Sequence, residues 1–187
     1  MPKIVDHNQI REDILSGSFE LFARTGFSSL TMREIAQQLG LSTGTLYHYF
    51  SSKEEIFRQM LKLLSRRDVL QAVSQISIER RPEEKLAAVF QFVSLKESYF
   101  QNLIFIILDF YRNENLADHR SIVVETASYY RDAINEHMGF KDPVAGNLLF
   151  SIVLGLILQR LMDPENAQFA QQAALAGRIL ETMGEQQ

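Results

Sequence analysis

Signals for the start and end of helices recur along the whole 187-residue chain, whereas long runs of alternating polar and apolar residues are absent. Alternation is typical of half-buried strands, so its absence favours a nearly all-helical fold. Pro82, Pro143 and Pro164 each stand where a first helical residue is expected, with Asp142 and Asp163 as caps before the last two. The sequence therefore predicts an all-α protein.

The first seventy residues contain signals for four helices. Apolar residues from Ile10 to Phe22 recur at helical spacing, and Gly26 follows as an expected helix end. Thr31 and Glu34 form a capping-box pattern, Ser42 can cap a third helix, and a second box opens at Ser52. Five further helices are expected at residues 82–100, 101–112, 115–138, 142–162 and 165–183.

Composition places the chain among ordinary folded proteins, with 46% hydrophobic and 22% charged residues. No segment is expected to supply the roughly 20 apolar residues that cross a bilayer, so no membrane partner is predicted. The N-terminus lacks a signal-peptide pattern and the chain has no cysteine. These observations predict a cytoplasmic protein.

Charge is distributed unevenly along the chain, whose net charge is −4. Residues 1–67 carry nine Lys and Arg against seven Asp and Glu, so the acidic excess belongs to the remainder. A mildly basic segment joined to an acidic body is compatible with DNA binding, because phosphate contact depends on where the basic groups lie.

The segment from Thr31 to Leu46 has the pattern of a helix-turn-helix. Two short apolar-faced helices flank a turn at Gly40, and a helix supported in this way is stiff enough to enter the major groove of DNA. The first turn of the second helix would present serine and threonine hydroxyls to base edges. Arg33 on the preceding helix is the better candidate for bidentate contact with guanine.

An ordered string of motifs runs through residues 8–60: Gly26-Phe27, Thr31-Met32-Arg33-Glu34-Ile35-Ala36, Leu39-Gly40-Leu41-Ser42, Thr45-Leu46-Tyr47-His48-Tyr49-Phe50 and Lys53-Glu54-Glu55. Together these motifs resemble the N-terminal domain of TetR-type regulators. Tyr49 stands where many relatives have histidine, and Gly17-Ser18 replaces a usual pair of alanines, at a cost of up to ~1 kcal/mol for the glycine.

This resemblance implies that Tyr47, Tyr49 and Lys53 contact operator phosphates, and that Gly44 lets the helix approach the groove closely. Ser52 and Lys53 would also form a phosphate site on general grounds, because a helix N-terminus offers free N–H groups and partial positive charge. His48 reads as either a base contact or a surface histidine, Lys53 as either a phosphate contact or a solvated lysine, and Phe50 as core. The predicted DNA-binding residues are Thr31, Arg33, Ser42, Thr43, Gly44, Thr45, Tyr47, His48, Tyr49 and Lys53.

The predicted domains are a three-helix DNA-binding domain at 1–52 and a larger helical effector-binding and dimerisation domain at 53–187, with 53–70 as the connecting helix. Aromatic residues are abundant between 82 and 162. The resemblance implies an apolar effector pocket there, and a small lipophilic effector is preferred. Asp109 reads either as a ligand-binding carboxylate or as a cap or salt-bridge partner. The candidate ligand-binding residues are Phe90, Tyr99, Phe105, Asp109, Tyr111 and His119.

The predicted assembly is a homodimer on a palindromic operator of double-stranded DNA. The last two helices, the second rich in alanine, look built for close packing, and the family dimer is a four-helix bundle of two such helices per subunit. A ligand-relieved repressor is the expected function, and a DNA-bound scaffold for a protein partner is the alternative. No catalytic, cofactor or metal-binding pattern is found in the sequence, so an enzyme is not expected.

Overall fold

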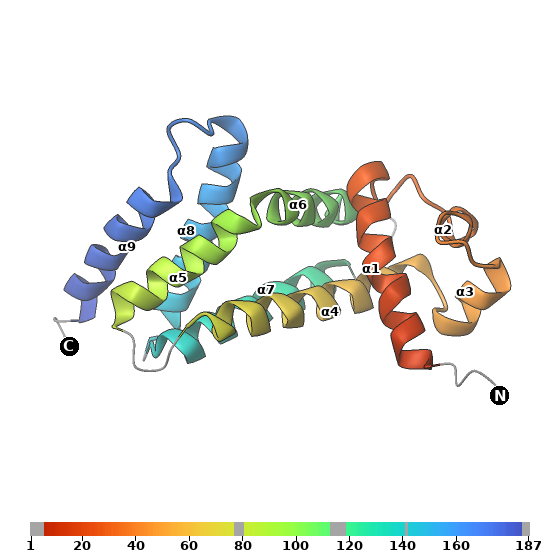
Figure 1. Cartoon of the computed structure of the whole chain (residues 1–187), viewed down its shortest axis with the longest axis horizontal. Coiled ribbons are helices and arrows are strands. Elements are labelled where there is room, and N and C mark those ends of the chain that lie inside the picture. Colours follow the sequence, from red (N-terminus) through yellow and green to blue (C-terminus); the bar gives the residue numbers. More distant parts are fainter. Residues whose placement is uncertain (1–5, 77–80, 113–118, 141, 185–187) are drawn as a thin grey trace. The chain divides into compact units, whose positions relative to one another are not determined.

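The computed structural model describes residues 6–76, 81–112, 119–140 and 142–184 (Figure 1). Within these residues the secondary structure is entirely helical, which confirms the predicted all-α class. The helices are α1 (His7–Thr25), α2 (Met32–Gln38), α3 (Thr43–Tyr49), α4 (Lys53–Ser74), α5 (Pro82–Leu95), α6 (Glu97–Tyr111), α7 (His119–Met138), α8 (Pro143–Met162) and α9 (Phe169–Gly184).

Most of the predicted helix ends are confirmed. Gly26 ends α1 with φ of 86°, a left-handed conformation that glycine adopts without strain. Thr31 and Glu34 form the complete capping box of α2, and the Ser52 hydroxyl accepts a hydrogen bond from the Glu55 N–H at the start of α4. Residues 115–118 of the expected seventh helix lie outside the described residues.

The expected helix start at Pro164 is wrong. Residues 164–166 form a turn, in which the Asp163 carboxylate accepts hydrogen bonds from the backbone N–H and side-chain amide of Asn166. Asp163 is therefore the cap of a turn, and α9 begins at Phe169, five residues after Pro164. A side-chain-capped turn and a helix N-terminus share the same short-range sequence signal.

The chain divides into two compact units. Unit 1 comprises Met1–Arg66 and Leu103–Thr126, and unit 2 comprises Arg67–Asn102 and Ala127–Gln187. Residues of α4, α6 and α7 belong to both units. This division follows compactness alone, so the functional boundary predicted at residue 52 stays a prediction.

Four phenylalanines form the aromatic centre of unit 1. Phe22, Phe27, Phe57 and Phe110 are each almost fully buried. The rings of Phe57 and Phe110 are stacked with centroids 4.1 Å apart, and Phe27 meets Phe110 edge-on at 4.8 Å. Offset stacked and edge-on pairs are favourable arrangements of aromatic quadrupoles. Phe110 comes from the end of α6, so a residue counted among the aromatics of the C-terminal part completes the core beneath α1 to α3.

The Gly17-Ser18 pair of α1 has a packing role. A methyl group at Gly17 would come within 2.6 Å of Cδ2 of Leu39, so the glycine permits the close approach of that side chain. Ser18 is fully buried and its hydroxyl donates to the carbonyl oxygen of Ile14 at 2.7 Å. The departure from the family's alanines therefore follows from local packing at α1.

In unit 2, α9 packs against α5 and α8. Ala173, Ala176 and Gly177 are buried, and a methyl group on Gly177 would stand 3.8 Å from Cδ2 of Leu86 on α5. The small residues of the last helix therefore serve close packing within the chain. The expectation that no segment is apolar and long enough to span a bilayer is wrong for α8, which meets that test by length and composition only. The core helix of a folded protein meets the same test.

Candidate nucleic-acid interface and polar cluster

The segment α2–turn–α3 of unit 1 has helix-turn-helix geometry. Gly40 takes a left-handed conformation with φ of 69°, and the Leu41 N–H closes the turn on the Ala36 carbonyl at 2.8 Å. The Ser42 hydroxyl caps α3 by accepting from the Thr45 N–H at 2.9 Å. Leu46 is completely buried and is the apolar anchor of this seven-residue helix. The short helix is thus held at its start by a cap and at its middle by packing.

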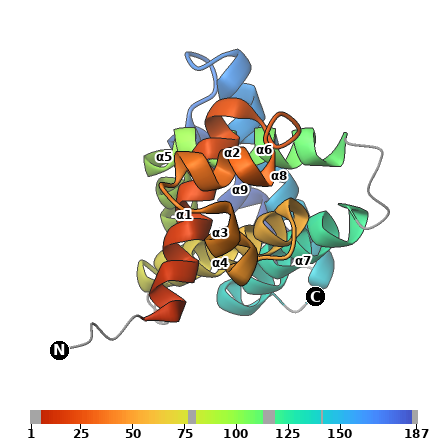
Figure 2. The same ribbon diagram turned by 90° about the vertical axis from the view of Figure 1, so that its right-hand side faces the viewer.

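The residues predicted to contact DNA lie on α2 and α3, on their caps and at the first position of α4 (Figure 2). Tyr49 and Lys53 are half-buried, and the remaining members of the set are exposed. Phe50, predicted as core, is buried, with the guanidinium of Arg11 placed 4.8 Å from its ring centroid. The polar side of α3 is therefore open to a partner, while its apolar side is used within unit 1.

The Tyr49 hydroxyl has a partner that the sequence reading did not identify. It lies 2.9 Å from Nδ1 of His7, the first residue of α1, and the Arg11 guanidinium lies 5.9 Å from the Tyr49 ring centroid. No local sequence pattern indicates this pair, because its members are 42 positions apart in the chain. The predicted phosphate contact is thus joined to the N-terminal end of α1.

Lys53 supports the connection between α1 and α2. Its ammonium donates to the carbonyl oxygens of Phe27 at 2.8 Å and Leu30 at 2.6 Å, and it lies 4.2 Å from the Phe27 ring centroid. Burial lowers the pKa of this lysine, while Glu54, Asp109 and Glu34 act in the opposite direction. The third N–H of the ammonium is the one that a phosphate contact at Lys53 would use.

Asp109, a candidate ligand-binding residue, bonds within unit 1. Its carboxylate accepts hydrogen bonds from the Ser28 N–H at 3.0 Å and the Ser28 hydroxyl at 3.3 Å. A methyl group on Gly26 would stand 3.2 Å from Oδ2 of Asp109. These contacts make Asp109 a polar partner of the connection between α1 and α2, which is neither the cap nor the salt bridge that the sequence offered as the alternative to ligand binding. A ligand-binding role for Asp109 stays a prediction.

The other candidate ligand-binding residues are spread over both units. Phe90 is buried in α5 and Tyr99 is half-buried on α6, both in unit 2. Phe105 and Tyr111 belong to unit 1 and are 47% and 49% exposed. The side chain of His119 lies outside the described part of the chain. A common pocket for this set stays a prediction.

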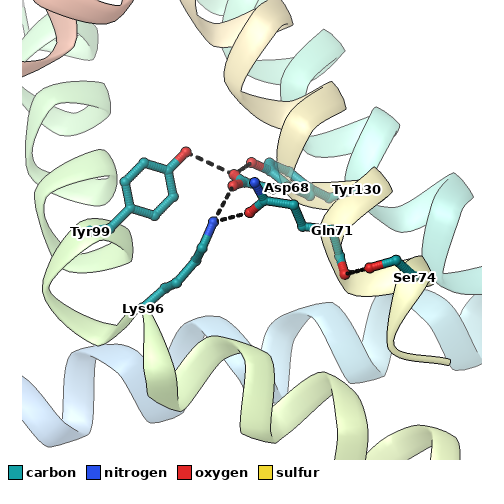
Figure 3. Close-up of polar contacts among 6 residues, drawn as sticks. All are labelled: Asp68, Gln71, Ser74, Lys96, Tyr99 and Tyr130. Atoms are coloured by element: carbon teal, nitrogen blue, oxygen red, sulfur yellow. Dashed lines mark hydrogen bonds and ion pairs between the residues drawn. The ribbon is translucent and has the colours of Figure 1, made fainter.

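Unit 2 contains a polar cluster around one buried carboxylate, which we define as Asp68, Tyr99, Tyr130 and Lys96 (Figure 3). Asp68 on α4 is 3% exposed. Its Oδ2 accepts hydrogen bonds from the hydroxyls of Tyr99 at 2.9 Å and Tyr130 at 2.7 Å, and its Oδ1 lies 3.8 Å from Nζ of Lys96. The ammonium of Lys96 also donates to the side-chain oxygen of Gln71. One carboxylate thereby joins α4, α6 and α7.

Burial sets the protonation behaviour of the cluster. It raises the pKa of Asp68, against the opposing effect of the hydrogen bonds from Tyr130 and Tyr99 and of the charge on Lys96. Burial also raises the pKa values of Tyr99 and Tyr130, and the nearby Asp68 carboxylate raises them further. Both phenols therefore remain donors throughout the neutral range.

Of this cluster the sequence reading singled out only Tyr99, although a signal for Asp68 is present. Buried Phe57, Leu61 and Leu64 recur at helical spacing along α4, and Asp68 occupies the next position of the same stripe. A carboxylate on an apolar stripe must find partners in the interior, since an unpaired buried charge is costly.

The fold and the exposed polar side of α3 define a helix-turn-helix protein of the kind that binds DNA. Residues 14–60 match the model of the family described as bacterial regulatory proteins, tetR family. Over these residues the chain is similar to the N-terminal helix-turn-helix domain of TetR-type regulators.

Two curated relatives and one solved structure illustrate the likeness. The chain is 31% identical over 90 residues to the HTH-type transcriptional regulator PksA of Bacillus subtilis, a match that covers 48% of this chain and 43% of PksA. It is 30% identical over 106 residues to the HTH-type transcriptional repressor KstR2 of Mycobacterium tuberculosis, covering 52% and 50%. The chain thus spans about half the length of these relatives or less.

The solved structure is that of the regulator FadR from Bacillus subtilis in complex with stearoyl-CoA. It superposes with a TM-score of 0.68 at 22% identity, covering 90% of this chain and 96% of that chain. At this identity the likeness concerns the fold.

Proposed function

We propose that this protein is a ligand-relieved repressor that binds a palindromic DNA operator as a homodimer. The observation that carries the proposal is the two-sided character of α3, whose Leu46 is fully buried while Thr43, Thr45 and Tyr47 are exposed. An element held by one face and polar on the other suits insertion into the major groove. Arg33, exposed on α2, adds the side chain best suited to guanine.

The dimer is supported by one exposed stripe along α8. Its six members are uncharged, and they follow each other at alternating intervals of four and three residues, the spacing of a helix seam that packs against another helix. The stripe consists of Val144, Leu148, Ser151, Gly155, Leu158 and Met162. Such an apolar face on a single chain suits burial against a second copy, since large exposed apolar patches mark interaction sites.

The effector is proposed to be lipophilic with a polar group. Unit 2 contains buried Phe90, Phe92 and Phe100, and apolar effector sites combine such walls with a few polar groups that fix orientation. The polar cluster around Asp68 offers groups of that kind. FadR, which binds stearoyl-CoA, is an example of this fold in complex with an acyl-chain ligand.

Relief of repression requires that effector and DNA favour different states of one dimer. A twofold dimer presents its two α3 helices to half-sites about one DNA turn, ~34 Å, apart. An effector that favours another spacing of these helices lowers DNA affinity, and the coupling free energy between the effector site and the DNA site sets the size of this decrease. The same coupling makes DNA weaken the binding of effector.

The test begins with duplexes enriched from random-sequence DNA by the wild-type protein. We expect a palindromic sequence, bound by a dimer in gel shift and sedimentation. Arg33→Ala combined with Tyr47→Phe should abolish specific binding without changing the sedimentation of the free protein. Enrichment of no sequence, or unchanged affinity of the double variant, would contradict the proposed interface.

The effector is sought by thermal-shift measurements with fatty acids of increasing chain length, since a ligand that binds the native state raises the unfolding temperature. A stabilising compound should also release the selected duplex. The scaffold function would be favoured instead by two results together. A stabilising compound would leave DNA binding unchanged, and the DNA-bound dimer would recruit a protein to the operator.

A further inference from the structure

The N-terminal end of α1 meets α3 at a group of exposed rings. Nδ1 of His7 lies 2.9 Å from the Tyr49 hydroxyl, and the centroids of the two rings are 6.0 Å apart. The ring of His48 lies 6.3 Å from that of His7 and 5.2 Å from that of Tyr49. His7 is exposed, on the same helix-turn-helix unit as the residues proposed to bind DNA.

We propose that His7 is a positioning residue of the DNA interface: with a proton on Nδ1, its ring holds the Tyr49 oxygen and leaves the Tyr49 O–H free to donate to a phosphate. This inference rests on the proposed DNA-binding role of α3. It adds to that interface a residue of α1 that acts through Tyr49, and it makes DNA affinity sensitive to pH.

The argument follows from the donors and acceptors of the pair. A phosphate oxygen is an acceptor, so Tyr49 contacts it through its single O–H. When Nδ1 of His7 lacks a proton, it is itself an acceptor. At 2.9 Å it then accepts a hydrogen bond from the Tyr49 O–H, which is no longer available to a phosphate. When the ring is positively charged, both nitrogens are donors, so the Tyr49 oxygen accepts from His7 and its O–H is released.

Other charged or titratable side chains lie near the His7–Tyr49 pair, and two of them form hydrogen bonds elsewhere. The Asp6 carboxylate accepts from the backbone N–H groups of Asn8 and Gln9, and the Arg11 guanidinium donates to Gln59. His48 is a second imidazole beside Tyr49, with ring centroids 5.2 Å apart. Where the neutral His7 ring carries its proton on Nε2, protonation of Nδ1 within the range of about pH 5 to 8 in which histidine changes charge should raise DNA affinity, by an amount that depends on His7 and Tyr49 together.

The experiment measures binding of the full-length chain to a duplex that the wild type selects from random-sequence DNA, at pH 8 and pH 6 and constant salt. His7→Asn and His7→Gln supply two side chains that form hydrogen bonds without titrating. Tyr49→Phe removes the hydroxyl, and the His7→Asn, Tyr49→Phe double variant closes the cycle. His137→Gln, on α7 in unit 2, is the control for loss of an imidazole elsewhere. Thermal unfolding verifies that each variant is folded.

We expect the wild type and His137→Gln to gain roughly three- to tenfold more affinity between pH 8 and pH 6 than His7→Asn or His7→Gln, the range of one net hydrogen bond. Tyr49→Phe should also lack this additional gain in affinity. The His7→Asn, Tyr49→Phe double variant should show the same pH response as Tyr49→Phe alone. Equal pH responses in wild type and both His7 variants would overturn the inference, as would a full response in Tyr49→Phe. Those results leave the proposed function intact, whereas failure of the wild type to select any duplex contradicts that function itself.

Discussion

The carboxylate of Asp109, at the end of α6, accepts hydrogen bonds from both the backbone N–H and the hydroxyl of Ser28, at 3.0 and 3.3 Å. Ser28 lies in the connection between α1 and α2. The bond therefore ties the last turn of α6 to the loop that precedes the helix-turn-helix, within unit 1.

Asp109→Ala should lower the free energy of unfolding by about 1 kcal/mol, because two donors of Ser28 lose a charged acceptor and are left to water. Urea unfolding measures the change. Asp132→Ala removes an exposed aspartate from α7 and should shift stability by less than about 0.5 kcal/mol. Equal stability of Asp109→Ala and wild type would show that the Ser28 bond adds nothing to the fold.

Phe110→Ala should be far more destabilising. Phe110 is fully buried against Phe27 and Phe57, and truncation of a buried phenylalanine costs about 3–5 kcal/mol through lost burial and the cavity left behind. Phe105→Ala makes the same change on the same helix at a side chain that is 47% exposed, and should cost about 1 kcal/mol or less. Similar losses in the two variants would argue against the four-phenylalanine core.

Lys53→Met separates two roles of one lysine. Loss of the ammonium removes the donor to the carbonyl oxygens of Phe27 and Leu30 and should lower the free energy of unfolding by about 1–3 kcal/mol. If Lys53 also contacts a phosphate, the salt dependence of DNA binding should decrease by about one unit of slope. Lys62→Met, at an exposed position of α4, is the matched control and should change neither quantity. Unchanged stability would remove the structural role.

Local features of the fold were predictable from the sequence, and features made by distant segments were not. The box of Thr31 and Glu34 involves residues three apart, so its pattern is visible in the sequence and is confirmed. Asp68 was overlooked because its two phenolic partners come from α6 and α7, and an isolated aspartate gives no sign of them.

The candidate site also combines local features that were predictable with contacts between distant residues that were not. The exposed polar face of α3 follows from helical spacing around Leu46, which the sequence reading placed at the contact between the two short helices. The partners of Tyr49 and Lys53 lie 42 and up to 26 residues away, at separations where only the folded chain determines contact. Asp109 is another residue whose partner the sequence did not indicate. Its position after an apolar run was compatible with either a ligand-binding carboxylate or a cap or salt-bridge partner, and its partner Ser28 lies far away in the sequence.

The buried Asp68 predicts a pH-dependent contribution to stability. Burial raises its pKa in the folded state, so between the ordinary value of about 3.9 and that raised value the native state binds more protons than the unfolded state. The contribution of Asp68 is therefore full below the unfolded pKa and is lost as pH rises through the folded pKa.

Asp68→Asn removes this titration and keeps an oxygen that can accept from Tyr99 or Tyr130. The stability of wild type relative to the variant should fall as pH rises from about 4 and level off above the folded pKa, by about 1.4 kcal/mol for each unit of pKa shift. Denaturant unfolding at a series of pH values measures the difference. A constant difference across the series would contradict the raised pKa.

The stripe on α8 predicts how the dimer can be broken. Leu158 is a member of the stripe and is 39% exposed in the single chain, so a glutamate there would place a charge from each copy in the interface between them. Burying an unpaired charge at an interface costs about 2–5 kcal/mol, so Leu158→Glu should weaken dimerisation by roughly thirtyfold or more in sedimentation equilibrium. Leu95→Glu makes the same change at a leucine of α5 that is 73% exposed and should leave the dimer unchanged. Circular dichroism of both variants should match the wild type, because neither side chain belongs to the buried core. A Leu158→Glu protein that remains as dimeric as the wild type would exclude this stripe as the dimer interface, and would point to another exposed face such as that of α6.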